Sequence, residues 1–186
     1  AVSEEDRRRL LAAMRTIQGI LDPAPRREPY LIRPPRPGDY GWIVHRHGAL
    51  YDQEYGWGAA HEALVARIVA DYIDRYDERR TAMWIAESDG EPVGSIACMR
   101  KDDETAQLRL FLVEPRARGM GIGTRLVEEC LRFARGAGYR RIMLWTYDAL
   151  AAARRIYQRA GFTLDRSEPV TAYGRRLHGQ IWSRDL

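Results

Sequence analysis

The sequence predicts an α/β (α+β) domain in which helices flank a mixed central sheet, with a separate helix at the N-terminus. Strand-like segments and amphipathic helical segments alternate along the chain. The earlier strands are joined by tight turns, which indicate antiparallel pairs, whereas the later strands are separated by helices, which indicate crossovers. The length of 186 residues, with 45% hydrophobic and 30% charged residues, fits one globular domain and a short extension.

The first predicted element is a helix over residues 3–21. Ser3 and Asp6 resemble an N-terminal cap, and apolar residues follow at helical spacing: Leu10, Leu11, Met14, Ile17, Ile20 and Leu21. The proline-rich segment after this helix has the composition of a linker. We therefore divide the chain into residues 1–27, a helix and linker, and residues 28–186, the main domain.

The main domain is predicted from hydrophobic periodicity and turn residues. Strands are expected at Tyr30–Arg33, Met83–Glu87, Val93–Met99, Gln107–Val113, Arg141–Thr146, Phe162–Arg166 and Arg176–Ser183. Helices are expected from Asp39 to about Leu50 and over residues 59–77, 121–135 and 150–159. The turn Ser88–Glu91 joins the second and third strands, and it contains the Asp-Gly pair of a tight hairpin.

Composition and charge exclude several classes of function. No apolar run is long enough to span a membrane, and the charged N-terminal segment is unlike a signal peptide, so we expect a cytoplasmic protein. The net charge of +4 comes from arginines scattered along the chain, which is typical of a solvated surface. Cys98 and Cys130 lack metal-ligand spacing and are expected to be buried thiols, so no metal is predicted.

The glycine-rich segment between Val113 and Thr124 is the most informative part of the sequence. A predicted strand enters it, three glycines stand at alternate positions from 119 to 123, and a predicted helix leaves it. Glycine permits positive φ and lets a ligand approach the backbone, and the N–H groups at a helix N-terminus attract anions. With Arg116 and Arg118 beside it, the segment is predicted to bind a pyrophosphate.

Spacing separates three kinds of glycine-rich anion loop. The nucleoside-triphosphate loop ends in Gly-Lys-Ser/Thr, whereas Thr124-Arg125 follows Gly123 here. The dinucleotide fingerprint would need glycine where Thr124 or Leu126 stands, and several strands precede the loop, so a nicotinamide-dependent oxidoreductase is the weaker alternative. The third pattern, Arg/Gln-x-x-Gly-x-Gly/Ala, is matched at every fixed position by residues 116–121.

Through this pattern the chain resembles the GNAT N-acetyltransferases, a superfamily that uses acetyl-coenzyme A (acetyl-CoA). Other segments resemble the family in the same order: Ile32-Arg33 with Asp39, the hairpin Gly90–Gly94, and the closing helix and Gly-Phe signature at Arg154–Phe162. The resemblance covers roughly residues 30–186. It implies a GNAT fold with a mostly antiparallel sheet of about six or seven strands. It also implies transfer of an acetyl group to a primary amine by direct attack in a ternary complex.

Within that family, the chain is similar to a subgroup fused to a MarR-type winged-helix regulator. The similarity lies in His45–Trp57, Arg100–Leu110 and Leu144–Phe162, and residues 1–21 resemble the end of such a regulator's last helix. An alternative function is therefore an acetyl-CoA-sensing module with little turnover. The partners implied are acetyl-CoA and an amine. No membrane contact and no direct nucleic-acid contact are expected, and a homodimer is common in such enzymes.

The resemblance also assigns the cofactor contacts. The diphosphate is expected on the backbone N–H groups of residues 118–124, and the pantetheine arm on a strand end that separates from its neighbour. The cofactor-binding residues are thus Leu112, Val113, Arg118, Gly119, Met120, Gly121, Gly123, Thr124 and Tyr157. One position departs from the family, because Leu150 stands where an asparagine that contacts the pantetheine is common.

Catalytic roles follow from the same resemblance. Tyr157 is expected to protonate or hydrogen-bond the departing thiolate, and the Val113 N–H to polarise the thioester carbonyl. The amine must also lose a proton, and the family has no single fixed base for this step. Glu104 is the first candidate base, Glu54 the second and His47 the third.

The aromatic segment Tyr51–Trp57 is expected to contribute to the acceptor pocket. The rings of Tyr51, Tyr55 and Trp57 can enclose an aliphatic or cationic amine. The predicted substrate-binding residues are Glu54, Tyr55 and Trp57. Aromatic residues that pin two helices together would explain the same pattern equally well.

Overall fold

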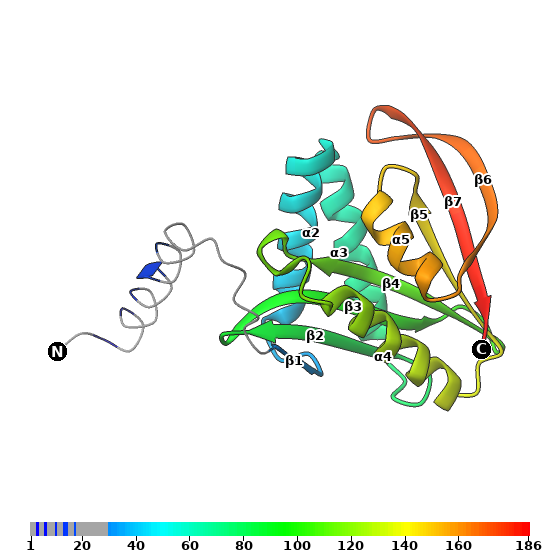
Figure 1. Cartoon of the computed structure of the whole chain (residues 1–186), viewed down its shortest axis with the longest axis horizontal. Helices are drawn as coiled ribbons and strands as arrows, with labels where there is room; N and C mark the ends of the chain where they lie inside the picture. The colour runs from blue at the N-terminus through cyan, green and yellow to red at the C-terminus, as the bar shows by residue number, and fades with distance from the viewer. Residues whose placement is uncertain (1–2, 4–5, 7–9, 11–12, 15–16, 18–29) are drawn as a thin grey trace.

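A mixed seven-stranded sheet organises the part of the chain that the structure describes. The computed structural model describes residues 3, 6, 10, 13, 14, 17 and 30–186. Within residues 30–186 the strands lie in the order β1-β2-β3-β4-β5-β7-β6 (Figure 1). The strands are β1 Tyr30–Arg33, β2 Ala82–Ser88, β3 Glu91–Arg100, β4 Thr105–Val113, β5 Arg141–Tyr147, β6 Thr163–Ala172 and β7 Arg175–Asp185. The helices are α2 Asp39–Tyr55, α3 Gly58–Asp74, α4 Ile122–Gly136 and α5 Ala151–Arg159, with a 3₁₀ turn at Pro115–Ala117.

Strand direction confirms the predicted fold class. Every pair of neighbours in this sheet is antiparallel except β4 and β5, which are parallel. The crossover between β4 and β5 is α4, as expected for a parallel pair. The predicted turn Ser88–Glu91 is a two-residue hairpin whose central Asp89 and Gly90 have φ of 53° and 76°.

Two hydrophobic clusters hold the helices on opposite faces of the sheet. One cluster packs Ile43 of α2 and Val65 and Val69 of α3 against Ile85 and Ala97. The other packs α4 against the opposite face through residues that include Ile122, Leu126, Val127, Cys130, Ile96 and Leu108. Because β3 is covered from both sides, residues 93–99 are all buried.

A buried ion-pair network fixes the start of α2. The Arg33 guanidinium donates to Asp39 and to Glu87, each at 2.5 Å, and thereby joins β1, α2 and β2. Burial would raise the pKa of Asp39, but hydrogen bonds and charge from Arg33 and Arg36 outweigh it and lower that pKa. The network positions a helix whose last turn reaches the candidate site.

The strand β4 changes face part-way along its length. Ser95 lies opposite Leu112 and Ala97 lies opposite Arg109, so β4 carries one extra residue, a β-bulge. Leu110 has a φ of 52° at this point, and its carbonyl accepts a hydrogen bond from Ser95 Oγ at 2.7 Å. As a result Leu108 belongs to the cluster under α4, whereas Leu110 belongs to the cluster under α2 and α3.

The strands β4 and β5 separate soon after they meet. Their ladder covers only residues 105–107 of β4 and residues 141–143 of β5. Beyond this point the remaining two thirds of β4 has no partner on the β5 side. This split leaves the C-terminal part of β4, which leads into the glycine-rich loop, without a partner on the side that faces β5.

Two predicted boundaries are wrong. The helix α2 continues past Leu50 to Tyr55 and ends at Gly56, whose φ is 68° and whose N–H donates to the Asp52 carbonyl at 2.7 Å. The segment predicted as an aromatic loop is therefore largely the last turn of a helix. The strand β6 extends to Ala172, beyond the predicted Arg166, because it forms a long hairpin with β7 through Tyr173-Gly174.

Most of the predicted N-terminal helix and all of its linker lie outside the described residues. At its start, Ser3 Oγ accepts a hydrogen bond from the Asp6 N–H at 3.0 Å, which is the contact expected of a cap. The division near residue 27 stays a prediction. None of the helices described is long and apolar enough to cross a membrane.

Candidate functional site

Unpaired backbone N–H groups line the loop between β4 and α4. Gly119 and Gly121 both have a φ of 82°, a backbone conformation that residues other than glycine rarely adopt. No N–H group from residue 119 to residue 124 donates to another described residue, and the first helical bond runs from the Arg125 N–H to the Gly121 carbonyl at 3.1 Å. The start of α4 therefore presents consecutive free donors where the helix dipole also favours an anion.

Gly123 is required for a different reason. A Cβ atom at this position would lie 2.8 Å from Ile156 Cδ1 and 3.2 Å from the Phe111 ring. These are the side chains of α5 and β4 that face the first turn of α4. The glycine therefore lets three elements approach one another at the loop.

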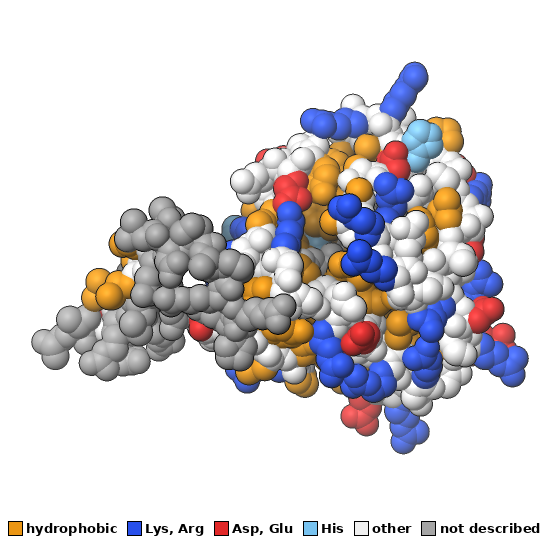
Figure 2. All heavy atoms as spheres, in the orientation of Figure 1, with side chains coloured by type: hydrophobic (Ala, Val, Ile, Leu, Met, Phe, Trp, Pro, Cys, Tyr) orange, Lys and Arg blue, Asp and Glu red, His pale blue; other side chains and the backbone are white. Residues whose placement is uncertain are grey.

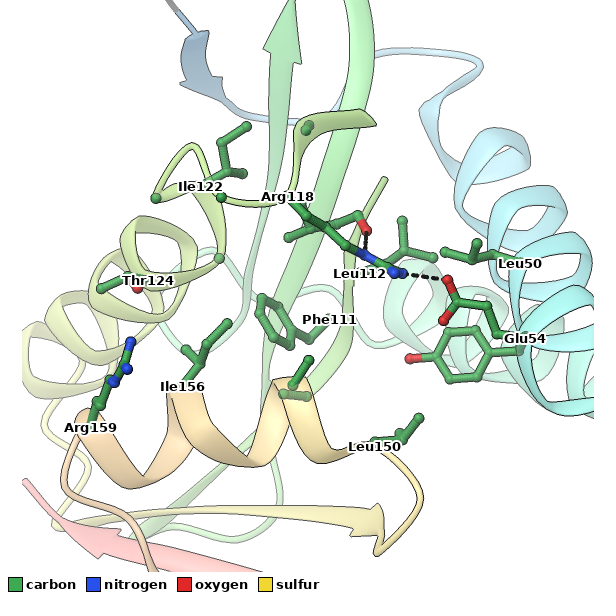
Figure 3. A pocket seen from close by; sticks show the side chains of 18 of the residues that line it. Leu50, Glu54, Phe111, Leu112, Arg118, Ile122, Thr124, Leu150, Ile156 and Arg159 are labelled. Atoms are coloured by element: carbon green, nitrogen blue, oxygen red, sulfur yellow. Dashed lines mark hydrogen bonds and ion pairs between the residues drawn. The ribbon is translucent and has the colours of Figure 1, made fainter. Parts of the chain in front are cut away.

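A cavity of about 400 Å³ opens beside this loop (Figure 3). Seven predicted cofactor-binding residues line it: Leu112, Val113, Arg118, Gly119, Gly121, Gly123 and Thr124. Two others do not line it, since Met120 packs against the core cluster under α4 and Tyr157 lines a neighbouring cavity. The volume and largely apolar walls suit a small-molecule ligand.

Charged side chains stand at the edges of this cavity. The Arg118 guanidinium forms an ion pair with Glu54 at 2.7 Å and also contacts the Val113 carbonyl at 3.4 Å. From the opposite wall, Arg159 of α5 points toward the first turn of α4 near Thr124 (Figure 3). Figure 2 shows hydrophobic side chains in the hollow between α2 and α5 and basic side chains along its edges. Arg159 was missed from the sequence, where it is one of several arginines on one helix.

A second cavity, of about 120 Å³, adjoins the first. Tyr51, Phe111 and Leu150 line both cavities and therefore form their common wall. The smaller cavity lies between α2, α3, β4 and β5 and the turn between β6 and β7. The two cavities thus meet at the split between β4 and β5.

An aromatic cluster forms one side of the smaller cavity. Trp57 is only 3% exposed. Its ring centroid lies 4.9 to 5.2 Å from the ring centroids of Tyr51, Tyr55, His61, Tyr147 and Tyr173. Trp57 therefore joins two helices to the β6–β7 turn as well as lining the cavity. The other two predicted substrate residues, Glu54 and Tyr55, line the larger cavity instead.

Two buried histidines face the smaller cavity. The Nδ1 of His47 lies 2.9 Å from the Ile43 carbonyl, and that of His61 lies 3.1 Å from the Tyr173 hydroxyl. The Nε2 atoms of both rings are buried and have no hydrogen-bond partner among the described residues. Because a carbonyl can only accept, His47 carries its proton on Nδ1 when neutral, and its Nε2 is a free acceptor. Burial lowers the pKa of both imidazoles to about 4.

Comparisons with known proteins agree with this geometry. The model of the acetyltransferase (GNAT) family matches residues 39–162, which includes the loop and both cavities' main walls. The human protein N-acetyltransferase 8B is 37% identical over 87 residues, which are 44% of this chain and 38% of that protein. The chain thus spans well under half the length of this curated relative.

The chain belongs to the GNAT acetyltransferase family. Solved structures show the same fold. An acetyltransferase from Streptococcus agalactiae superposes with a TM-score of 0.66 at 24% identity over 84% of this chain and 98% of that one. A GNAT family acetyltransferase from Elizabethkingia anophelis, solved with acetyl-CoA bound, gives a TM-score of 0.59 at 17% identity over 84% and 98% of the two chains.

The two residues predicted to act on the thioester lie on opposite sides of the common wall in this GNAT chain. Val113 lines the larger cavity, whereas Tyr157 lines the smaller one and packs against Phe111 with ring centroids 5.7 Å apart. Burial raises the pKa of Tyr157 well above its usual value. Leu150, which stands in place of the family asparagine, contributes an apolar side chain to both cavities.

The structure does not bring Glu104 to the site. It precedes the first residue of β4, at the opposite end from Val113, and a nine-residue strand is about 26 Å long. Its side chain is 65% exposed and forms an ion pair with Arg140 at 3.2 Å. The sequence showed that this acid adjoins the central strand but not which end of that strand meets the loop.

Several residues of the smaller cavity were missed from the sequence. They include His61 of α3, Gln107 and Arg109 of β4, Tyr147 at the end of β5 and Tyr173 in the turn between β6 and β7. These residues are far apart in the chain and carry no common motif. In the described part of the chain, no group of three His, Cys, Asp or Glu side chains is placed to hold a metal ion.

The buried histidines predict a specific dependence of stability on pH. Their folded pKa of about 4 lies below the ordinary value of 6.5, so the unfolded chain binds more protons between these values. The free energy of unfolding should therefore fall as pH is lowered from 6.5 to 4, by up to about 1.4 kcal/mol per pH unit for each histidine. Denaturant unfolding of His47→Gln/His61→Gln should show a shallower dependence than wild type, whereas the exposed control His45→Gln should keep it. Equal slopes in all three proteins would contradict this assignment.

Proposed function

We propose that this GNAT chain transfers the acetyl group of acetyl-CoA to a primary amine by direct attack within a ternary complex. The observation that carries the proposal is the row of unpartnered N–H groups at residues 119–124, which opens into the larger cavity. The second cavity shares a wall with the first, so two substrates can be held on either side of one reacting carbon. Known relatives with the same fold include one solved with acetyl-CoA.

The diphosphate of coenzyme A binds at the start of α4. Its oxygens accept hydrogen bonds from N–H groups of residues 119–124, in a position that the helix dipole also favours. The Arg118 N–H is already bonded to the Pro115 carbonyl at 3.3 Å, so Arg118 contributes through its side chain. Arg159 adds positive charge from α5, because it points toward the same turn (Figure 3).

The pantetheine arm lies in the split between β4 and β5. The strand edges that face the split have no ladder partners there, so they can donate to and accept from the two amides of the arm, as they would with a neighbouring strand. Leu112 and Val113 line this part of the cavity, and Leu150 faces them from the N-terminus of α5. With leucine in place of asparagine, the contact on the α5 side is apolar.

The Val113 N–H polarises the thioester carbonyl. The register pairs Leu112 with Ser95, and the Glu114 N–H donates to the Val93 carbonyl at 2.8 Å. In an antiparallel ladder the intervening N–H points to the other side, so the Val113 N–H is directed away from β3 and toward the split. A donor at this place stabilises the oxyanion that forms when the amine attacks.

Tyr157 supplies the proton that the departing thiolate needs. The Tyr157 phenol is protonated at neutral pH, as a general acid must be, and because burial raises its pKa the proton leaves only as negative charge develops on the sulfur. In the reaction the amine nitrogen forms a bond to the acetyl carbon and the C–S bond breaks. The thiolate takes the Tyr157 proton, and a proton released by the amine restores the tyrosine.

The amine enters through the smaller cavity. Glu104 has no part in this step, since it lies at the far end of β4. Glu54 is paired with Arg118 on the cofactor side. The Nε2 of His47, which is a free acceptor because the Nδ1 proton is held by the Ile43 carbonyl, therefore takes the amine proton in this step.

An acetyl-CoA sensor with little turnover is the second hypothesis, and Leu150 in place of the family asparagine is the observation that favours it. Fusion to a MarR-type regulator also stays a prediction, and the comparisons supply no support for it. The cytoplasmic location and the homodimer also remain predictions. Thiol release from acetyl-CoA across an amine panel separates the two functions, because a sensor would bind the cofactor without amine-dependent release.

Substitution at Gly121 tests the anion cradle. In Gly121→Glu the left-handed backbone is strained and a carboxylate occupies the diphosphate position, so the Kd for acetyl-CoA should rise at least about tenfold. Gly138→Glu is the matched control, since it has a φ of 79° and open space around it but lies at the other end of α4. Calorimetric titration should show the loss in Gly121→Glu alone; unchanged affinity there would refute the placement of the diphosphate.

Substitution of Tyr157 tests the proton donor. Tyr157→Phe should lower kcat about 100-fold, the usual contribution of a general acid, while the Kd for acetyl-CoA changes little. Tyr72→Phe removes a hydroxyl from another buried tyrosine, in the cluster under α2 and α3, and should leave kcat unchanged. Turnover by Tyr157→Phe at the wild-type rate would remove Tyr157 from the mechanism.

A further inference from the structure

The smaller cavity carries an unusual set of charges for a site that receives an amine. Arg109 is the single Lys, Arg, Asp or Glu among its lining residues in the described chain. The two histidines that line it are neutral at pH 7, because burial lowers the pKa of each to about 4. A cationic polyamine would therefore meet a positive charge and no carboxylate.

The Arg109 guanidinium lacks a partner of its own. It is half-buried on β4 and has no hydrogen bond or ion pair with any described residue. Burial lowers the pKa of Arg109. The negative charge of Asp71 on α3 raises that pKa by a smaller amount, and the two side chains do not form an ion pair. A half-buried guanidinium without a counter-ion carries part of the desolvation cost of a buried charge, and its planar donors fit a carboxylate in bidentate fashion.

A neutral acceptor lies in the same cavity as this unpaired cation. The His47 Nε2 is buried, free and in the acceptor form, because the Nδ1 proton is held by the Ile43 carbonyl at 2.9 Å. It can accept a hydrogen bond from a neutral amine and so direct the lone pair of that amine. Arg109 and His47 therefore offer one group for an anion and another for an N–H donor.

We propose that the acceptor is a small amine that also bears a carboxylate, as a free amino acid does, with Arg109 as the anchor for that carboxylate. This inference rests on the proposed function and names the class of amine that binds in the smaller cavity. The carboxylate binds the Arg109 guanidinium, and the amine lies toward the common wall formed by Tyr51, Phe111 and Leu150. The aromatic cluster around Trp57 then surrounds the remainder of the molecule.

The test compares acceptors that differ only in charge. The twenty proteinogenic amino acids and their carboxamides are assayed by thiol release from acetyl-CoA, with spermidine as a cationic amine. At least one free amino acid should exceed its carboxamide and spermidine in kcat/KM by on the order of 100-fold, the usual effect of removing one partner of a buried charge pair. A carboxamide or spermidine used as well as the best amino acid would overturn the proposal.

The variant Arg109→Gln tests the anchor itself. It should raise KM for the amino acid about 100-fold and leave the low activity on the carboxamide within about threefold. Acetyl-CoA affinity and Tm should stay at wild-type values, as should all kinetics of the control Arg67→Gln on the exposed face of α3. An equal loss on both acceptors would assign Arg109 a merely structural role.

Binding separates this proposal from the transferase function. The same amino acids are titrated calorimetrically into the chain saturated with coenzyme A. Binding that requires Arg109, without any turnover, would uphold the carboxylate site and refute the transferase function. Turnover of amines with no Arg109-dependent binding of any amino acid would uphold the transferase and overturn the carboxylate site.

Discussion

The row of backbone donors at the start of α4 is the constraint on which the rest of the site depends. A helix always leaves its first N–H groups without internal partners, but here the loop before the helix adds further free donors because two glycines hold it at a φ of 82°. No described side chain caps these groups. The neighbouring elements pack directly against this turn, because Gly123 has no side chain and allows Ile156 and Phe111 to approach it closely.

The second constraint is the short ladder between β4 and β5. The β-bulge at Leu110 rotates the strand, so that residues before and after it serve different faces of the sheet. Beyond Gln107 the two parallel strands are no longer paired. The bulge and the end of this ladder both lie beside the two cavities, and Tyr51, Phe111 and Leu150 stand between the cavities.

Local signals explain what the sequence could predict. The hairpin at Asp89-Gly90 and the loop at residues 119–123 depend on glycines with positive φ, which are visible in the sequence itself. Tight turns and helical crossovers predicted a mixed sheet, whereas the strand order, with β7 between β5 and β6, was not predicted. The helix α2 was predicted too short because Tyr51 and Tyr55 look like loop aromatics until their packing on Trp57 is seen.

The acceptor side was the least predictable part, since only the fold brings His61 and Arg109 to the same cavity. Glu104 was misplaced for the same reason: proximity in sequence to a strand does not say which end of the strand meets the loop.

Amide resonances report most directly on whether the start of α4 is an anion cradle. In ¹H–¹⁵N spectra of the labelled chain, coenzyme A should produce the largest shift changes at residues 119–124, whereas pantetheine, which lacks the diphosphate, should leave those amides nearly unchanged. Should coenzyme A bind while the amides of residues 119–124 stay unperturbed, the diphosphate lies elsewhere and the account of this site is wrong.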